Sequence, residues 1–454
     1  MNRRSLLILL CLLLLTAAAL FPGTREHNLE VVHQHEQWAP ETPEASGFQA
    51  DGSLRTHLPI LILHTDGAEI PGLVRGDSRV LTCRYDLITG DVNASDGEPS
   101  LQGDCHLTIR GNSSRDYPKK QYALKTVDAQ GLAADVPLLD MPAESSWVLN
   151  GSYIDHSMVR NYMVYNLAGE IMDYAPRARL CEVFLTDASG KLQYEGVYTL
   201  CEQIKLSPRR LDLEKLHPGH PETSFLMQMN SYIDNVRIWH LKPDGILTYS
   251  FDLEYPAMDQ LTEESYHYIE TQLLIFEKSL YDAVKFRSWD TFHNYVDLDS
   301  FVDYYLINEF FQNLDAGTRS TYLYQNLGGK ISIGPVWDFD GAFNNFSDVE
   351  NRYDYMKVKS TFYYRALFQD PEFVARCIRR YKELRKTVLS EETLLKYLDG
   401  CEAYLAGPAQ RNCRRWYGGN ETLWREDLEY MREFVRRRGA WMDENFEALC
   451  AIIE

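Results

Sequence analysis

The sequence predicts an α+β fold with a β-rich N-terminal part and a largely helical C-terminal part. Residues 58–67, 105–114 and 119–127 are short apolar or alternating stretches bordered by glycine or polar turns, as strands are. From about residue 350, apolar residues recur at helical spacing almost to the C-terminus. With 454 residues, 45% of them hydrophobic, the chain can bury one large core or two ordinary ones.

The region between these parts mixes both kinds of element. In order, we expect a helix over 155–172, a hairpin over 181–201, mixed segments to about 290, an amphipathic helix over 297–314 and a hairpin over 321–340. The last hairpin is expected to turn at Gly328 and Gly329. No clear linker divides residues 58–454, so the sequence predicts one domain there.

The first residues predict export. Arg3 and Arg4 precede a nearly continuous apolar run over 6–21, which is short for a spanning helix and ends in small residues suited to cleavage. We interpret residues 1–22 as a signal peptide or a signal anchor, and the alternative is a buried core helix. As an anchor, residues 5–21 would hold the chain to a membrane.

Residues 23–57 are expected to form a flexible tether, because they carry Pro, Glu, His and Ser without apolar periodicity. His33 and His35 fall in this polar stretch, and we interpret them as linker residues rather than metal ligands. The folded domain is then expected to span 58–454.

The charge balance argues against a nucleic-acid partner. The formal net charge is -20, and the chain has no long run of Lys or Arg. Phosphate backbones require concentrated positive charge, so any phosphate bound here has to be met by a local basic group.

The cysteine count suggests disulfides in an exported chain. Of nine cysteines, Cys11 lies in the N-terminal segment, and the others are Cys83, Cys105, Cys181, Cys201, Cys377, Cys401, Cys413 and Cys450. Cys181 and Cys201 flank the expected hairpin, and Cys401 and Cys413 flank an expected interhelical loop, so these two pairs are favoured. Neither a CxxC pair nor an HExxH motif occurs in the sequence, which argues against a structural zinc or a zincin site.

One basic cluster favours phosphate binding. The segment 108–125 concentrates positive charge in an otherwise acidic chain, through Arg110, Arg115, Lys119, Lys120 and Lys125. Backbone amides in its Gly and Ser loop can approach an anion closely. Alternation places Lys125 on the same strand face as Ala123, opposite Tyr122 and Leu124. The alternative is a solvated basic loop.

Two single acids stand at positions suited to a ligand. Glu202 lies where the strand in 195–205 ends, and such a strand end can line a planar ligand, although an ordinary surface residue is also expected there. Asp315 follows the helix at 297–314 and precedes an Ala-Gly step. Rigid neighbours would hold Asp315 while leaving it open to a substrate, which suits a general base. The alternative is an Asp that begins a turn.

The motif WDFDGAF, residues 337–343, places Asp338 and Asp340 among aromatic side chains. In a strand, residues two apart point to one face, so both carboxylates would converge while the aromatic rings pack opposite. Two such charges repel unless a metal ion, an arginine or a proton lies between them. The motif therefore predicts a cation site or, alternatively, a strand end whose acids reach solvent.

Four motifs, in order and spacing, resemble those of the spore coat protein H (CotH) kinase family. They are IRGNSSRDYPKKQYALK, WVLNGSYIDHSMVRN with Asp155 and Arg160, EGVYTLCEQI, and NLDAGTRSTYLYQNLGGKISIGPVWDFDGAF. The resemblance covers roughly 58–440. It implies an atypical protein-kinase-like fold that binds ATP with Mg²⁺ or Mn²⁺ and phosphorylates Ser or Thr hydroxyls of a protein substrate. It also implies a secreted, cell-surface or spore-associated protein.

The resemblance assigns roles motif by motif. Lys125 resembles the phosphate-binding lysine, with Arg110 beside it, and the strand through Glu202 resembles a hinge on the adenine side. Asp315 resembles the catalytic acid. Asp338, with Asp340 beside it, resembles the metal-binding acid.

The chain departs from the general protein-kinase pattern at two places. That pattern has a metal-binding Asn five residues after the catalytic Asp, where this chain has Ser320, a weaker neutral ligand. The Gly that directly follows Asp-Phe in the pattern is also missing. Glu170 is the candidate for an acid that pairs with the lysine.

Two other classes of function stay open. A pseudokinase or cell-surface binding module would keep the fold without turnover, and Ser320 favours it. A glycosidase would use Asp315 and Asp338 as a carboxylate pair in a cleft rich in Tyr and Trp, without ATP or metal.

Overall fold

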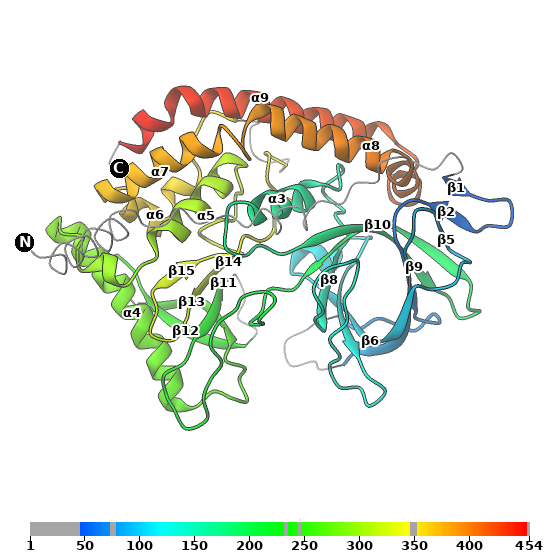
Figure 1. Ribbon diagram of the computed structural model, residues 1–454, viewed down its shortest axis with the longest axis horizontal. Helices are drawn as coiled ribbons and strands as arrows, with labels where there is room; N and C mark the ends of the chain where they lie inside the picture. Colours follow the sequence, from blue (N-terminus) through cyan, green and yellow to red (C-terminus); the bar gives the residue numbers. More distant parts are fainter. Residues whose placement is uncertain (1–45, 73–78, 231–234, 244–246, 346–351, 452–454) are drawn as a thin grey trace, which may run out of the picture.

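The protein places two β-structures side by side beneath a layer of helices (Figure 1). The computed structural model describes residues 46–72, 79–230, 235–243, 247–345 and 352–451. The sequence-based interpretation of residues 1–22 and of His33 and His35 lies outside these residues. Within the described ranges, the structure has no helix long and apolar enough to cross a membrane.

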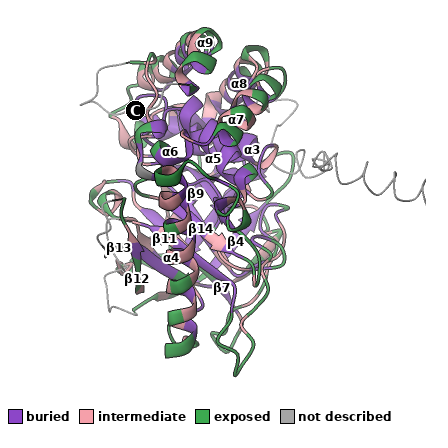
Figure 2. Ribbon diagram, turned by 90° about the vertical axis from the view of Figure 1, so that its left-hand side faces the viewer, coloured by how far each residue is buried: buried purple, intermediate pink, exposed green. Residues whose placement is uncertain are grey.

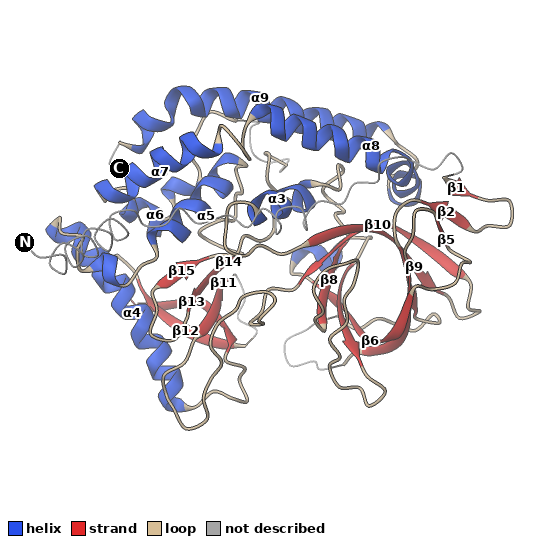
Figure 3. Cartoon of the chain, viewed as in Figure 1, coloured by secondary structure: helices blue, strands red, loops and turns tan. Residues whose placement is uncertain are grey.

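The first β-structure is a closed barrel with strand order β10-β8-β7-β6-β4-β3-β9 (Figure 3). Its strands are β3 (Ile60–His64), β4 (Leu81–Ile88), β6 (Leu101–Arg110), β7 (Gln121–Val127), β8 (Ser146–Asn150), β9 (Ala178–Thr186) and β10 (Leu192–Glu202). Neighbouring strands are antiparallel except β3 and β9, which run parallel. Trp147, Leu107 and Tyr198 are buried in its core. The strands and the hairpin predicted between residues 58 and 201 are confirmed.

A small sheet extends the fold before the barrel. It consists of β1 (Gly47–Phe48), β2 (Leu54–Thr56) and β5 (Asn93–Ala94). Leu54 and Thr56 are fully buried. The prediction of a flexible tether as far as residue 57 is therefore wrong for residues 46–57, because pairing of β2 with β5 compensates for their weak apolar pattern.

The second β-structure is a sheet with strand order β12-β13-β11-β14-β15. Its strands are β11 (Phe225–Met229), β12 (Val236–Leu241), β13 (Leu247–Tyr255), β14 (Thr321–Gln325) and β15 (Ile331–Ile333). The hairpin predicted around Gly328 and Gly329 is confirmed as β14 and β15. The long helix α4 (Glu263–Phe286) contacts β12 and begins with a capping box between Thr262 and Ser265.

Two buried helices lie between the β-structures and the outer helical layer. They are α3 (Arg160–Gly169) and α5 (Leu298–Phe310), whose residues are buried along nearly the whole helix (Figure 2). The outer helices are α6 (Phe362–Leu367), α7 (Pro371–Leu384), α8 (Glu391–Trp416) and α9 (Thr422–Cys450). Short 3₁₀ turns are η1 (Ser113–Asp116), η2 (Phe292–Asn294) and η3 (Val358–Ser360). One hydrophobic core joins α3, α5, the second sheet and the outer helices.

Neither predicted disulfide fits this fold. Cys181 packs inside the barrel, whereas Cys201 packs in the large core on the other side of the same sheet. Cys401 and Cys413 belong to the single helix α8 rather than to two helices joined by a loop. Twelve residues (413 − 401 = 12) along one helix span about 18 Å, too far for a disulfide.

A buried ion pair fastens the outer helix α9 to α5. The guanidinium of Arg438 donates to a carboxylate oxygen of Glu309 at 2.9 Å, and both side chains are fully buried. Arg438 also donates to the carbonyl oxygens of Tyr353 and Tyr355 at 2.7 Å. The Glu309 carboxylate accepts backbone N–H groups of residues 357–359. One pair thus fixes α5, α9 and the chain that precedes α6.

We expect Arg438→Ala to lower the free energy of unfolding by about 3–5 kcal/mol, because it leaves a buried carboxylate without its charged partner. Arg437→Ala is the matched control, since Arg437 pairs with Glu433 on the exposed face and should change little. Urea unfolding followed by circular dichroism measures both. Equal stabilities of the two variants would contradict this account of the core.

Candidate active site

The motif WDFDGAF lies in a loop after β15, and this corrects the sequence-based expectation of a strand. Residues 334–339 have no strand pairing, and Asp338 has a positive φ of 64°. Asp338 and Asp340 therefore do not share a face through strand alternation. A non-glycine residue in the left-handed region is held there by its surroundings.

Helix α3 supplies those surroundings. The side-chain oxygen of Asn161 accepts the N–H of Phe339 at 2.7 Å, and the Asn161 amide donates to the Asp340 carboxylate. The N–H of Asp338 donates to the Tyr165 hydroxyl at 3.2 Å. The Trp337 ring stacks on Tyr165 with centroids 5.5 Å apart. Successive residues of the loop are thus bound by one face of α3.

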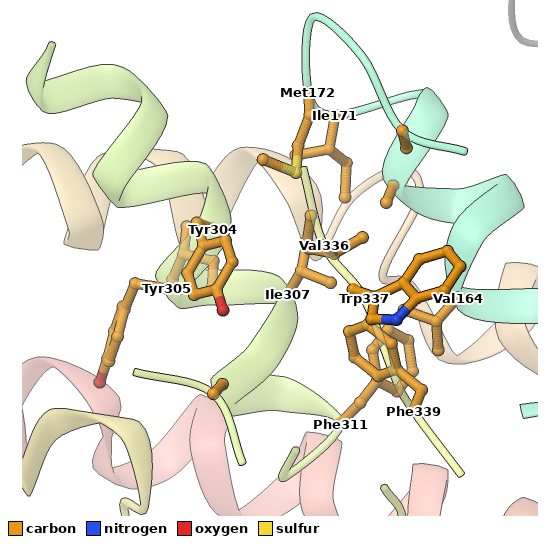
Figure 4. Close-up of a cluster of buried hydrophobic side chains, with 14 of the residues drawn as sticks. Val164, Ile171, Met172, Tyr304, Tyr305, Ile307, Phe311, Val336, Trp337 and Phe339 are labelled. Atoms are coloured by element: carbon orange, nitrogen blue, oxygen red, sulfur yellow. The ribbon is translucent and has the colours of Figure 1, made fainter. Parts of the chain in front are cut away.

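Aromatic packing completes the support of this loop. Figure 4 shows Trp337 beside Val164 of α3 and Phe339 beside Phe311, which follows α5. Phe339 is fully buried. Trp337 and Phe339 thus hold the loop that carries the acids through contacts with α3 and with the residue that follows α5, and not through a strand.

Arg160, at the first turn of α3, fixes the chain after the acids. Its Nε donates to the carbonyl oxygen of Ala342 at 3.2 Å. Its guanidinium pairs with Asp155 at 2.5 Å and with Asp427 of α9 at 2.6 Å, and Arg160 itself is fully buried. Two carboxylates and one guanidinium carry a net negative charge. The charge of Asp155 therefore adds to the negative charge near Asp340.

Asp315 and Ser320 reach the same place from the loop between α5 and β14. The Ser320 hydroxyl donates to a carboxylate oxygen of Asp338 at 3.1 Å, and Ser320 also has a positive φ of 48°. Asp315 is half-buried and lies 3.8 Å from the guanidinium of Arg319. Asn313 accepts the N–H of Asp315 at 3.3 Å and donates to the carbonyl of Trp337 at 3.4 Å. One amide therefore ties the Asp315 loop to the Asp338 loop.

The carboxylates repel one another in the absence of a cation. Burial and the neighbouring charge of Asp315 raise the pKa of Asp338, against the opposing effects of Ser320 and Arg110. Burial and the charges of Asp338 and Asp155 raise the pKa of Asp340 well above its ordinary value. The residues around these acids therefore favour a bound proton or a bound metal ion.

Arg110, at the end of β6, brings the barrel into the site. Its guanidinium carbon lies 5.5 Å from the centre of the Trp337 ring, and its charge opposes the rise in the pKa of Asp338. Arg110 pairs with Gln121 in the barrel ladder.

Lys125 lies on the expected face but not among the acids. It is exposed, while Tyr122 and Leu124 point into the barrel core. Lys125 pairs with Ser146 and lies four residues beyond Gln121, about 13 Å along the strand. From the basic segment 108–125, the fold thus brings Arg110 to the acids, whereas Lys125 lies toward the end of β10.

Glu202 is a structural anchor in the described structure. Its fully buried carboxylate pairs with Arg177 at 3.1 Å and with Arg210 at 3.7 Å. It also accepts the Tyr174 hydroxyl at 3.2 Å. The Glu202 carboxylate is therefore engaged within the fold, at the position where β10 ends.

A cavity of about 800 Å³ opens where β10 ends. Its lining includes residues 203–206 and 215–220, Ser146 of β8, and Leu226, Glu254 and Tyr255 of the second sheet. Both polar and apolar side chains face it, as in sites for small organic ligands.

Glu170 follows the last residue of α3, about 13 Å along the helix from Asn161, and is not adjacent to the acids.

The donor set fits a hard divalent cation. Asp338 and Asp340 supply carboxylate oxygens and Ser320 a hydroxyl oxygen, which are ligand types that Mg²⁺ and Mn²⁺ prefer. Across the described ranges, no group of three or more His, Cys, Asp or Glu side chains is arranged to hold a metal. A cation here would therefore complete its coordination with water and phosphate oxygens, as Mg²⁺ commonly does.

The sequence analysis missed Asn161, Tyr165 and Asn313, which position the acids. Asn161 lies at the end of the motif WVLNGSYIDHSMVRN, directly after Arg160. A polar Asn among the apolar residues of the expected helix was the available signal, because a buried amide requires hydrogen-bond partners.

We expect Asn161→Ala to weaken binding of Mn²⁺ with a nucleotide by about 10-fold or more, because the residue that orients Asp340 is lost. Asn166→Ala is the matched control: Asn166 is also buried on α3, but it donates to Tyr397 at 2.6 Å and touches neither acid. Isothermal titration measures both affinities. If both variants lost the same affinity for Mn²⁺ with nucleotide, the cause would be a general destabilisation of α3 and not the contact of Asn161 with Asp340.

The raised pKa of Asp340 leads to a pH-dependent prediction for the metal-free protein. A carboxyl group whose pKa is higher in the folded than in the unfolded state stabilises the fold while it is protonated. This contribution to the free energy of unfolding is lost as the pH rises through the folded-state pKa. In EDTA, Asp340→Asn should therefore raise the thermal midpoint at about pH 8, with the gain disappearing toward pH 4.

Asp427→Asn provides a control of opposite sign. Burial opposes ionisation of Asp427, but Arg160 outweighs it and holds the pKa of Asp427 below its ordinary value. This variant should therefore lower the midpoint at neutral pH. A gain for Asp340→Asn that does not change with pH would show that ionisation of Asp340 is not its cause.

Comparison with known proteins agrees with the sequence resemblance. A model of the family described as CotH kinase protein matches residues 107–442, which include every residue of the site described above. No curated protein matches the chain.

Proposed function

The chain belongs to the CotH kinase protein family, and from this premise we propose that it is a protein kinase. It would transfer the γ-phosphoryl group of ATP to Ser or Thr hydroxyls of a protein substrate, in a kinase-like arrangement with the barrel as the N-terminal lobe. The observation that carries the proposal is that three segments bring acids and a base together: the loop with Asp315 and Ser320, the loop with Asp338, and β6 with Arg110.

Asp315 is suited to orient the acceptor hydroxyl. It is half-exposed on a loop fastened by Asn313, so an incoming hydroxyl can reach its carboxylate while the loop stays in place. Its ion pair with the exposed Arg319 is long, at 3.8 Å, and leaves carboxylate oxygen available to a donor. Most of the rate enhancement would come from positioning, as phosphoryl transfer generally requires.

Asp338 and Asp340 would hold Mg²⁺ or Mn²⁺ with Ser320, and Arg110 would hold phosphate oxygens beside them. A bound cation supplies compensation for the charge of the phosphates and of the paired acids. Asp338 is the more accessible acid and accepts from Ser320, so it suits direct ligation. Asp340 is more deeply buried and is oriented by Asn161.

The cavity where β10 ends is suited to the nucleoside part of ATP. Residues 203–206 line it, and Lys125 lies toward this end of β7 through its pairing with Ser146, which also lines the cavity. Lys125 would then contact the ribose or phosphates from the barrel side. We retain export as part of the proposal, with the kinase outside the cytoplasm, at the surface or on a spore, and with residues 5–21 as its candidate membrane anchor.

Ser320 favours one alternative, a nucleotide-binding module without phosphoryl transfer. Its hydroxyl is already donated to Asp338, and a hydroxyl is a weaker metal ligand than the Asn amide oxygen of the general kinase pattern. The two candidates differ in turnover and not in nucleotide binding.

Incubation of residues 46–454 with γ-labelled ATP and Mn²⁺ should label the protein itself or casein. Asp338→Ala should reduce labelling to background, because the cation loses its most accessible ligand, and EDTA should do the same to the unaltered protein. Circular dichroism confirms folding of each sample. Nucleotide binding without labelling would favour the binding module, and labelling that survives both treatments would contradict the proposed site.

Substitutions at Ser320 separate metal ligation from local structure. Ser320→Asn should keep or raise the labelling rate, since Asn tolerates a positive φ and supplies an amide oxygen. Ser320→Ala should lower it by about 10-fold. Lys330→Ala, at the exposed turn between β14 and β15, should leave it unchanged. A loss with Ser320→Asn equal to that with Ser320→Ala would remove Ser320 from the metal site.

A further inference from the structure

Two buried cysteines face each other inside the barrel wall. Cys83 of β4 lies directly opposite Cys105 of β6 in the antiparallel ladder, and their sulfur atoms are 3.6 Å apart. Directly opposed residues in such a ladder have Cα atoms about 4.5–5.5 Å apart, within the range that a disulfide spans. Closing the bond requires the two sulfur atoms to approach by about 1.5 Å, which side-chain rotation can supply.

The two cysteine pairs favoured from the sequence do not offer this geometry. Cys181 and Cys201 lie in separate cores, and Cys401 and Cys413 lie about 18 Å apart along α8. We propose that Cys83 and Cys105 form a cross-strand disulfide when the folded protein meets a low-molecular-weight disulfide such as oxidised glutathione. The proposal rests on this geometry and does not depend on kinase activity.

The chemistry is a thiol–disulfide exchange in two steps. Cys83 is the more accessible thiol, at 7% exposure against 0% for Cys105, and the hydrogen bond from Cys105 lowers the pKa of Cys83. The Cys83 thiolate attacks oxidised glutathione, forms a mixed disulfide and releases one glutathione. Cys105 then loses its proton, attacks the Cys83 sulfur and releases the second glutathione. The two cysteines lose two electrons and two protons, which convert one oxidised glutathione into two reduced molecules.

The disulfide would join strands that the site depends on. β6 continues from Cys105 to Arg110, which faces the acids from the outer side of the barrel. Linking β6 to β4 restricts the unfolded chain across the 22 residues (105 − 83 = 22) between the cysteines. The oxidised protein should therefore melt a few degrees higher than the reduced protein.

Peptide mapping tests the proposal directly. The folded chain of residues 46–454 is treated with oxidised glutathione, denatured, alkylated with iodoacetamide without reductant and cleaved with trypsin. Because Arg84 lies between the cysteines, cleavage separates peptide 80–84 from peptide 85–110. We expect these two peptides to be recovered as one linked species that separates on reduction.

Two variants complete the experiment. Cys105→Ser should give no linked species and no rise in the thermal midpoint on oxidation. Cys181→Ser, whose altered residue lies in the same barrel core, should retain both. Recovery of Cys83 and Cys105 as separately alkylated peptides from the oxidised wild-type protein would overturn the proposal, as would linkage of either cysteine to a different partner.

Discussion

The repulsion between Asp338 and Asp340 is the constraint around which the centre of this fold is built. Two buried, ionised acids destabilise the folded state, as their raised pKa values indicate. The loop that carries them must therefore be held in place by its neighbours, and a cation or a proton must offset their charge. Helix α3 supplies the rigidity through Asn161, Tyr165 and Arg160. Because α3 has to bind this loop on one side and pack in the core on the others, it is buried along nearly its whole length, and its polar residues are matched by specific partners.

The same site depends on how the barrel is fixed to the helical part, because Arg110 comes from the barrel. Buried polar contacts connect the two. The Lys119 ammonium donates to the carbonyl of Val197 and to Asn412 of α8 at 2.9 Å, and burial lowers its pKa to about 7. Arg411 of α8 pairs with Glu182 of β9 at 2.8 Å. These contacts hold the barrel at a set position, so that Arg110 faces Trp337 and Asp338.

The sequence allowed the prediction of element types and of several residues that meet at the site, including Asp315, Ser320, Asp338 and Arg110, but not of the residues that position them. Apolar runs and alternation identified β3, β6, β7, β9 and β10, whereas β4 and β8 were not predicted. Alternation failed at residues 337–340, where side chains of α3 hold Asp338 at a positive φ that no local pattern reveals. The predicted disulfides were wrong for a similar reason, because a position beside a hairpin does not reveal which face of the sheet a cysteine occupies. The register that places Cys83 opposite Cys105 depends on strand pairing across 22 residues (105 − 83 = 22). Lys125 was placed on the correct face, yet the distance along β7 that separates it from the acids follows only from the ladder.

The central claim is that Asp338 and Asp340 form a divalent-cation site that is completed by a nucleotide. The most direct measurement is a crystal structure of residues 46–454 grown with Mn²⁺ and a non-hydrolysable ATP analogue, with anomalous data collected for manganese. We expect an anomalous peak at about 2.1–2.3 Å from an Asp338 oxygen, bridged to phosphates beside Arg110, with the nucleoside in the cavity that residues 203–206 line. A bound nucleotide without manganese at Asp338, or manganese only at distant surface acids, would contradict the account.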